Sequence, residues 1–147
     1  NYIVMSSFSF KIEGIREINA ALEKFSFNME RNIAKSAVRA GANVIAKEAR
    51  LIVPVGKSKT LKKSIRVVAR SRKQGHAVAS IVTRSGKEWR KKGMDAWYAP
   101  LVEFGTKYIP ARPFMRRALD GKVREVVQAM SDTVEKRIMG LALKAGK

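Results

Sequence analysis

The spacing of the apolar residues changes twice along this chain, and that change limits the folds open to it more than any other feature. From residue 28 to about 52, apolar or small side chains recur every three or four positions, as on one face of a helix. From 65 to 84 they alternate with polar residues, which is typical of strands, and from 114 to 141 the helical spacing returns. Two long helices around a strand pair predict a domain of the α+β class.

The first long helix is expected to begin with Asn28 as its N-cap and to end before Pro54. Most residues of its inner stripe are small: Ile33, Ala34, Ala37, Val38, Ala40, Gly41, Val44 and Ile45. A stripe of small residues lets a second backbone approach closely, so this helix is expected to pack tightly on a sheet or on another helix. A generic Ala-rich helix explains the same composition equally well.

The last long helix is expected over 113–145, with Pro113 at its first helical position. Its apolar stripe comprises Phe114, Ala118, Leu119, Val123, Val126, Val127, Met130, Val134, Ile138 and Leu141. All ten positions are expected to face the core, because they repeat at helical spacing.

Shorter elements are expected between and before these helices. Residues 6–12 alternate in the manner of a half-buried strand, and 15–25 have the spacing of a short amphipathic helix. Thr60 is a candidate cap for one helical turn, which precedes a hairpin of 65–70 and 77–84 turned at 71–75. Residues 85–94 lack periodicity, so we expect an exposed, mobile, basic loop. The segment 95–106 fits either a helical turn or a strand.

The length of 147 residues fits a single domain spanning 1–147. The expected architecture is two long helices and a shorter one packed on a small, mainly antiparallel sheet, with an extended basic loop. No apolar run approaches the length needed to span a bilayer. Met5-Ser6-Ser7 is typical of a translation start, which raises the expectation that residues 1–4 precede the natural one.

The basic charge is concentrated in one part of the chain. The net charge is +19, and residues 57–94 carry thirteen Lys or Arg against Glu88 alone. This stretch could line a channel or dock an acidic partner, bind nucleic acid directly, or form a solvated surface. The candidate contact residues are Arg66, Arg70, Arg72, Lys73, Arg84, Lys87, Trp89, Arg90, Lys91 and Lys92. Trp89 is expected to pack locally rather than to stack on a base.

The sequence offers little material for catalysis. Gly56-Lys57-Ser58 matches the end of a phosphate-binding loop, but Leu51 stands where that loop needs its first glycine. His76 is the only histidine, cysteine is absent, and the acidic residues are scattered. We therefore expect no enzyme activity, no metal and no cofactor.

The segment after the basic stretch carries a recognisable motif. Glu103-Phe104-Gly105-Thr106 is followed, after a spacer, by Pro110-Ala111-Arg112-Pro113-Phe114, which opens the last helix. Together with the Ala-rich helix, Pro54 and Leu-Lys-Lys-Ser-Ile at 61–65, it resembles the tail-completion, or head–tail joining, family of long-tailed bacteriophages and prophages.

The resemblance implies a non-enzymatic virion protein, assembled in the bacterial host cytoplasm, that forms a ring in the phage neck. Such a ring, expected to be a hexamer, joins the tail tube and tail terminator to the head connector or stopper around the DNA channel. A small basic protein that binds nucleic acid without sequence specificity is the alternative. The motif residues are candidates for the fold or for subunit contacts: Glu103, Phe104, Gly105, Thr106, Pro110, Arg112, Pro113 and Phe114.

Three motif residues have expected physical roles. Gly105 suits a left-handed or closely packed turn, and Arg112 can offer its guanidinium to a carboxylate such as Glu103. Residues 109–113 form a Pro-rich connection, which we call the elbow, and Phe114 is expected to anchor it in the core.

Overall fold

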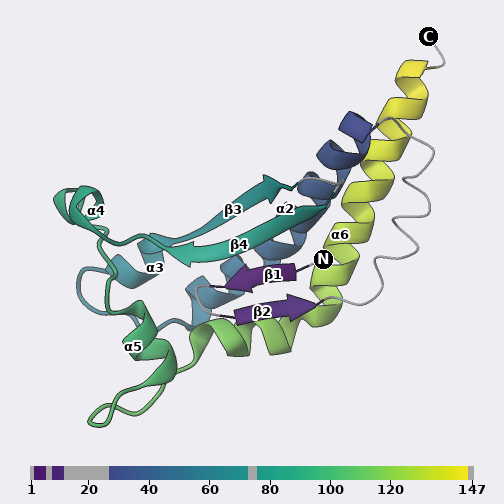
Figure 1. Cartoon of the computed structure of the whole chain (residues 1–147). Helices are drawn as coiled ribbons and strands as arrows, with labels where there is room; N and C mark the ends of the chain where they lie inside the picture. The colour runs from purple at the N-terminus through teal and green to yellow at the C-terminus, as the bar shows by residue number, and fades with distance from the viewer. Residues whose placement is uncertain (1, 6–7, 12–26, 73–75, 146–147) are drawn as a thin grey trace.

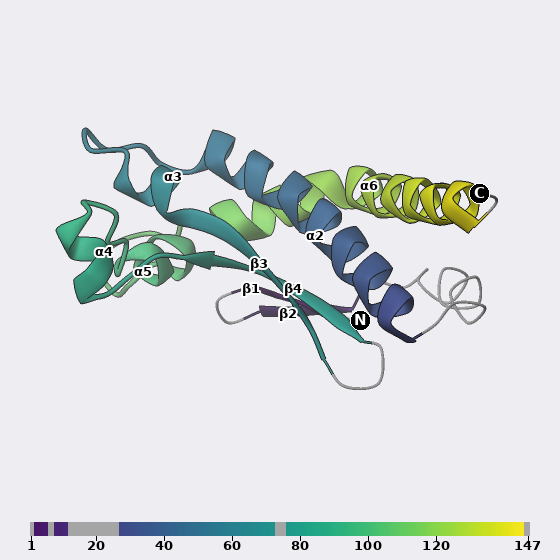
Figure 2. The same cartoon turned by 90° about the horizontal axis from the view of Figure 1, so that it is seen from above.

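A computed structural model of the chain describes residues 2–5, 8–11, 27–72 and 76–145 (Figure 1). The long helix α2 (Phe27–Ile52) covers one face of a four-stranded sheet, and the long helix α6 (Phe114–Ala145) packs beside α2 (Figures 1 and 2). The short helices α3 (Thr60–Ser64), α4 (Lys87–Lys91) and α5 (Ala99–Phe104) gather at one end of the sheet. The prediction of an α+β class is confirmed.

The sheet has the order β2-β1-β4-β3 and is mainly antiparallel. Strands β3 (Ile65–Ser71) and β4 (Ala77–Thr83) form the expected hairpin, and β2 (Phe8–Lys11) confirms the strand expected within 6–12. The unexpected strand β1 (Tyr2–Met5) pairs antiparallel with β2 and parallel with β4. The helix expected at 15–25 lies outside the described residues, as do positions 6, 7 and 12.

The core lies between the sheet and the two long helices. Ile65, Ala79 and Ile81 face it from the hairpin. Ile45 and Ala46 of α2, both completely buried, belong to the same core cluster. The stripe of small residues on α2 therefore packs tightly against the sheet, which is one of the two packing partners expected for this helix.

The same helix is also tightly packed against α6. A Cβ atom at Gly41 would lie 2.8 Å from the Cγ of Met130 and 3.0 Å from a methyl carbon of Val126. Only a residue without a side chain fits this crossing unchanged. Both alternatives of the sequence-based expectation are thus confirmed, because α2 packs on the sheet and also against α6.

Several boundaries differ from expectation. Asn28 is the second residue of α2 rather than its N-cap, and Pro113 immediately precedes α6 instead of opening it. Thr60 begins α3, but its side chain makes no capping hydrogen bond. Val123 and Val127 are 51% and 43% exposed, so their expected burial is wrong. Helix α6 packs mainly on one neighbour, α2, which covers a narrower face than its ten apolar positions span.

Within the described residues, no helix is both long enough and apolar enough to cross a membrane.

Candidate functional site

A concave basic surface lies between α2, α3 and strand β3, with a volume of about 810 Å³. Asn43, Ile65 and Val67 line it together with seven cationic side chains: Arg39, Arg50, Lys59, Lys62, Lys63, Arg66 and Arg84. No carboxylate is among these lining residues. We call this set the basic groove. Its unbalanced positive charge attracts anions, and salt should weaken that attraction.

The basic groove unites two parts of the chain, of which sequence reasoning found one. Arg66 and Arg84 were among the candidate contact residues, whereas Arg39 and Arg50 come from α2, outside the basic stretch. The available signal was the helical spacing of positions 39, 43 and 50, which places polar side chains on one face of α2.

The other basic candidates lie outside the lining of the groove. Arg70 and Arg72 are exposed on and just after β3, and the basic residues of α4 are exposed beside its half-buried Trp89. Lys73 lies outside the described residues.

Trp89 holds three of the cations together. The side-chain charges of Arg84, Lys92 and Arg66 lie 4.7, 5.0 and 5.7 Å from the centre of its ring. Cation–π attraction offsets part of the repulsion among these cations. Trp89 is half-buried and therefore packs locally, as expected.

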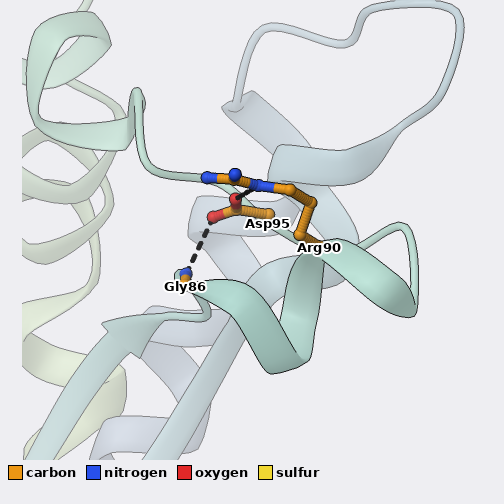
Figure 3. Close-up of polar contacts among 3 residues, drawn as sticks. All are labelled: Gly86, Arg90 and Asp95. Atoms are coloured by element: carbon orange, nitrogen blue, oxygen red, sulfur yellow. Dashed lines mark hydrogen bonds and ion pairs between the residues drawn. The ribbon is translucent and has the colours of Figure 1, made fainter.

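Asp95, just beyond α4, binds both the N-cap and the last turn of that helix (Figure 3). Its carboxylate accepts hydrogen bonds from the Gly86 amide and from the Arg90 guanidinium, each at 3.0 Å. The Gly86 hydrogen bond, with the Arg90 charge, lowers the pKa of Asp95 below its ordinary value.

The sequence predicted a loop without regular structure at 85–94, and this prediction is wrong. Residues Lys87–Lys91 form α4. Five residues are too few to show a helical period, and the partner that holds the helix in place, Asp95, lies beyond the segment. The mobility expected for this segment stays a prediction.

Glu103 links α5 to the start of α6. Its side chain is buried, and its two carboxylate oxygens accept the backbone N–H groups of Met115 (2.9 Å) and Arg116 (3.0 Å). These donors belong to the first turn of α6, where N–H groups lack partners within the helix and the helix dipole favours negative charge. The expected pair of Glu103 with Arg112 is wrong: Arg112 is exposed, and its backbone N–H bonds to the Val102 carbonyl. Two amides of α6 already occupy the carboxylate.

Gly105 and Thr106 shape the connection between the two helices. Gly105 has φ +73°, and a Cβ atom there would lie 2.6 Å from the backbone nitrogen of Ala111. The Thr106 hydroxyl accepts the N–H groups of Tyr108 and Ile109 at 3.2 and 3.0 Å. The turn expected at Gly105 is confirmed.

The elbow is anchored at its far end, because Phe114 is buried in the core as expected. Pro110 is exposed, and Pro113 is half-buried directly before α6.

The segment around this elbow also exposes large apolar side chains. Trp97 is 63% exposed and Tyr108 is 87% exposed. Leu101, Phe104 and Ile109 are exposed by 41 to 55%. We call these five residues the elbow surface. Large apolar side chains exposed on one segment are candidates for protein–protein contacts.

Chemistry at a metal site has no support within the described part of the chain, where no three His, Cys, Asp or Glu side chains come together. A small α+β domain with a basic groove and an exposed apolar elbow has the features of an assembly protein, which acts through its contacts.

The family comparison is consistent with this class. Residues 16–105 match the family model described as "Bacteriophage HK97-gp10, putative tail-component". The chain therefore belongs to the HK97-gp10-like family, and the expected relationship to phage tail proteins is confirmed. It is a structural tail protein of the virion that interacts with other tail or virion proteins. No curated protein and no solved structure matches the chain.

Proposed function

We propose that this tail protein is a ring-forming subunit of the phage neck, which completes the tail and links the tail tube to the head connector around the DNA channel. The observation that carries the proposal is the elbow surface, five large apolar side chains that this tail protein exposes beside the tight turn at Gly105. Burying these side chains in a contact with a neighbouring subunit would remove apolar area from water, worth roughly 25 cal/mol per Å².

A closed ring repeats one heterologous contact, so each subunit needs two different surfaces. The elbow surface supplies one of them. The exposed Val123 and Val127 on α6 supply a candidate for the second. Six copies around the axis would match the hexamer implied by the family resemblance.

The exposed cations outside the basic groove suit a place near the DNA channel or against an acidic partner ring. Arg70 and Arg72 lie at β3, and Lys87, Arg90, Lys91 and Lys92 extend from α4. In a channel they would meet phosphates without reading bases. The alternative, a small nucleic-acid-binding protein, requires steeply salt-dependent DNA affinity in the isolated monomer.

Light scattering and negative-stain imaging, with and without purified tail tubes and at low and high salt, test the proposal. We expect a ring, alone or on a tube end. The variant Tyr108→Asp should prevent ring formation, because it places a charge in the contact, whereas Leu143→Asp on the end of α6 is the matched control. A persistent monomer that ignores tail tubes and binds DNA would overturn the proposal in favour of the alternative.

A further inference from the structure

The outer edge of β3 has backbone groups available for pairing. Strand β3 is the last strand in the sheet order, and no strand among the described residues pairs with its second side. The bonds from Arg84 N–H to the Ser64 carbonyl and from Arg72 N–H to the His76 carbonyl identify the even-numbered residues as those that bond to β4. The odd-numbered residues 65, 67, 69 and 71 therefore direct their N–H and C=O groups away from β4.

This edge borders the basic groove. Ile65 and Val67 line the groove, and the Ile65 carbonyl accepts a hydrogen bond of 2.8 Å from the Arg50 guanidinium. A side chain of α2 thus already occupies one acceptor at the start of the edge. The next outward-facing groups, those of Val67, lie within the cationic lining.

The charge of the groove selects what can pair here. Two copies of this chain would bring two sets of cations together if their β3 edges met, and like charges at an edge oppose such pairing. A strand with acidic side chains would be attracted instead, since no carboxylate lines the groove to compete with it.

From this arrangement we propose that the basic groove binds an extended acidic segment of another virion protein, which adds to the free edge of β3 as a fifth strand. A peptide supplies both donors and acceptors to an edge that offers both, whereas a phosphodiester backbone supplies only acceptors. Trp89, the aromatic residue nearest these cations, already has three of them within 6 Å of its ring centre, and a base stacking there would compete with them. The inference rests on the chain's role in the virion, but it requires neither the ring nor the neck position.

The ligand follows from the geometry. Strand β3 has seven residues, so a segment of similar length can pair along it. Side chains of a strand alternate between its two faces, and the segment should therefore alternate Glu or Asp with an apolar residue. The acidic residues would lie on the face of Arg66 and Arg84, and the apolar ones on the α2 face, toward Ile65 and Val67.

Fluorescence anisotropy with a labelled peptide of alternating Glu and Val tests the proposal on the full chain. The same peptide N-methylated at every second residue keeps its charge but loses the N–H groups that face β3, and we expect it to bind at least about tenfold more weakly. A single-stranded oligonucleotide of equal charge should also bind at least about tenfold more weakly. In NMR spectra, the Val67 amide should become protected from exchange when the unmodified peptide binds.

Charge-reversal variants locate the binding site. Lys62→Glu and Arg50→Glu should each weaken peptide binding about tenfold or more, whereas Lys144→Glu, the same change at the end of α6, should leave it unchanged. Lys62→Glu keeps the test decisive if the loss of the Arg50 hydrogen bond unfolds the chain.

Equal binding of the two peptides would overturn strand addition, and tighter binding of the oligonucleotide would overturn the choice of a peptide ligand. Absence of peptide binding would also overturn the inference. Ring formation and tube capping are measured separately, so the proposed function can fail while this inference stands, and the reverse.

Discussion

Glu103 is the residue whose replacement tests the structure most directly. The residue is 7% exposed, and its carboxylate accepts two N–H groups from the first turn of α6, Met115 at 2.9 Å and Arg116 at 3.0 Å. Glu103→Ala would leave both donors without this partner, and Glu103→Gln would keep one acceptor while turning an NH₂ group toward the other donor. Neither variant changes the apolar core.

The expected losses differ between the two variants. A buried donor left without a partner costs about 1–3 kcal/mol, so Glu103→Ala should lower the free energy of unfolding by about 3 kcal/mol. Glu103→Gln, which loses one hydrogen bond and the charge at the helix N-terminus, should cost about 1–2 kcal/mol. For a chain of this length, 3 kcal/mol corresponds to a decrease of about 6–12 °C in Tm.

Urea denaturation followed by circular dichroism measures both changes, with Glu135→Ala on the exposed side of α6 as the control. The control should stay within about 0.5 kcal/mol of the parent. A loss below about 0.5 kcal/mol for Glu103→Ala would refute the idea that Glu103 stabilises the start of α6. Equal losses for both variants would refute the accounting by individual hydrogen bonds.

Three further predictions follow from the backbone and from Asp95. Gly105→Ala should lower the free energy of unfolding by at least about 2 kcal/mol in urea denaturation, because φ is +73° and a Cβ atom would clash with the backbone. Gly121→Ala, with open space around it, is the control and should raise the free energy of unfolding by about 0.5–1 kcal/mol. The reverse order would contradict the turn geometry. Gly41→Leu should cost about 1–3 kcal/mol by forcing α2 and α6 apart, and an unchanged Tm would argue against their close crossing. Asp95 should stabilise α4 above its unfolded-state pKa, near 3.9, and lose this contribution as the pH falls through its lower folded-state pKa. NMR titration of the Gly86 amide should therefore give a midpoint below 3.9 that disappears in Asp95→Asn, and a midpoint at or above 3.9 would contradict the hydrogen bond.

The main elements were predictable because each depends on residues close together in the chain. The helical spacing of 28–52 and 114–141 and the alternation of 65–84 correspond to α2, α6 and the hairpin within a few residues at each end. Gly105 and Phe114 were also assigned correctly, since a turn glycine and a core aromatic follow local rules.

The site was only partly predictable. Arg66 and Arg84 were expected to form part of a basic surface, but their neighbours Arg39 and Arg50 belong to a helix that the hairpin meets only after folding. Val123 was expected in the core because its spacing fits the apolar stripe. Spacing alone does not tell how much of the helix surface a neighbouring element covers, and Val123 is exposed.

The sequence by itself determined the α+β class, the order of its main elements, the concentration of positive charge and the relationship to phage tail proteins. Periodicity and composition are enough for these features, because none of them depends on which element packs against which. The tertiary structure decided the partners: Glu103 binds the amides of α6 rather than Arg112, Asp95 holds α4, and α2 completes the basic groove. Each of these contacts joins a side chain to groups outside its own helix or strand, so the spacing within one element does not predict it.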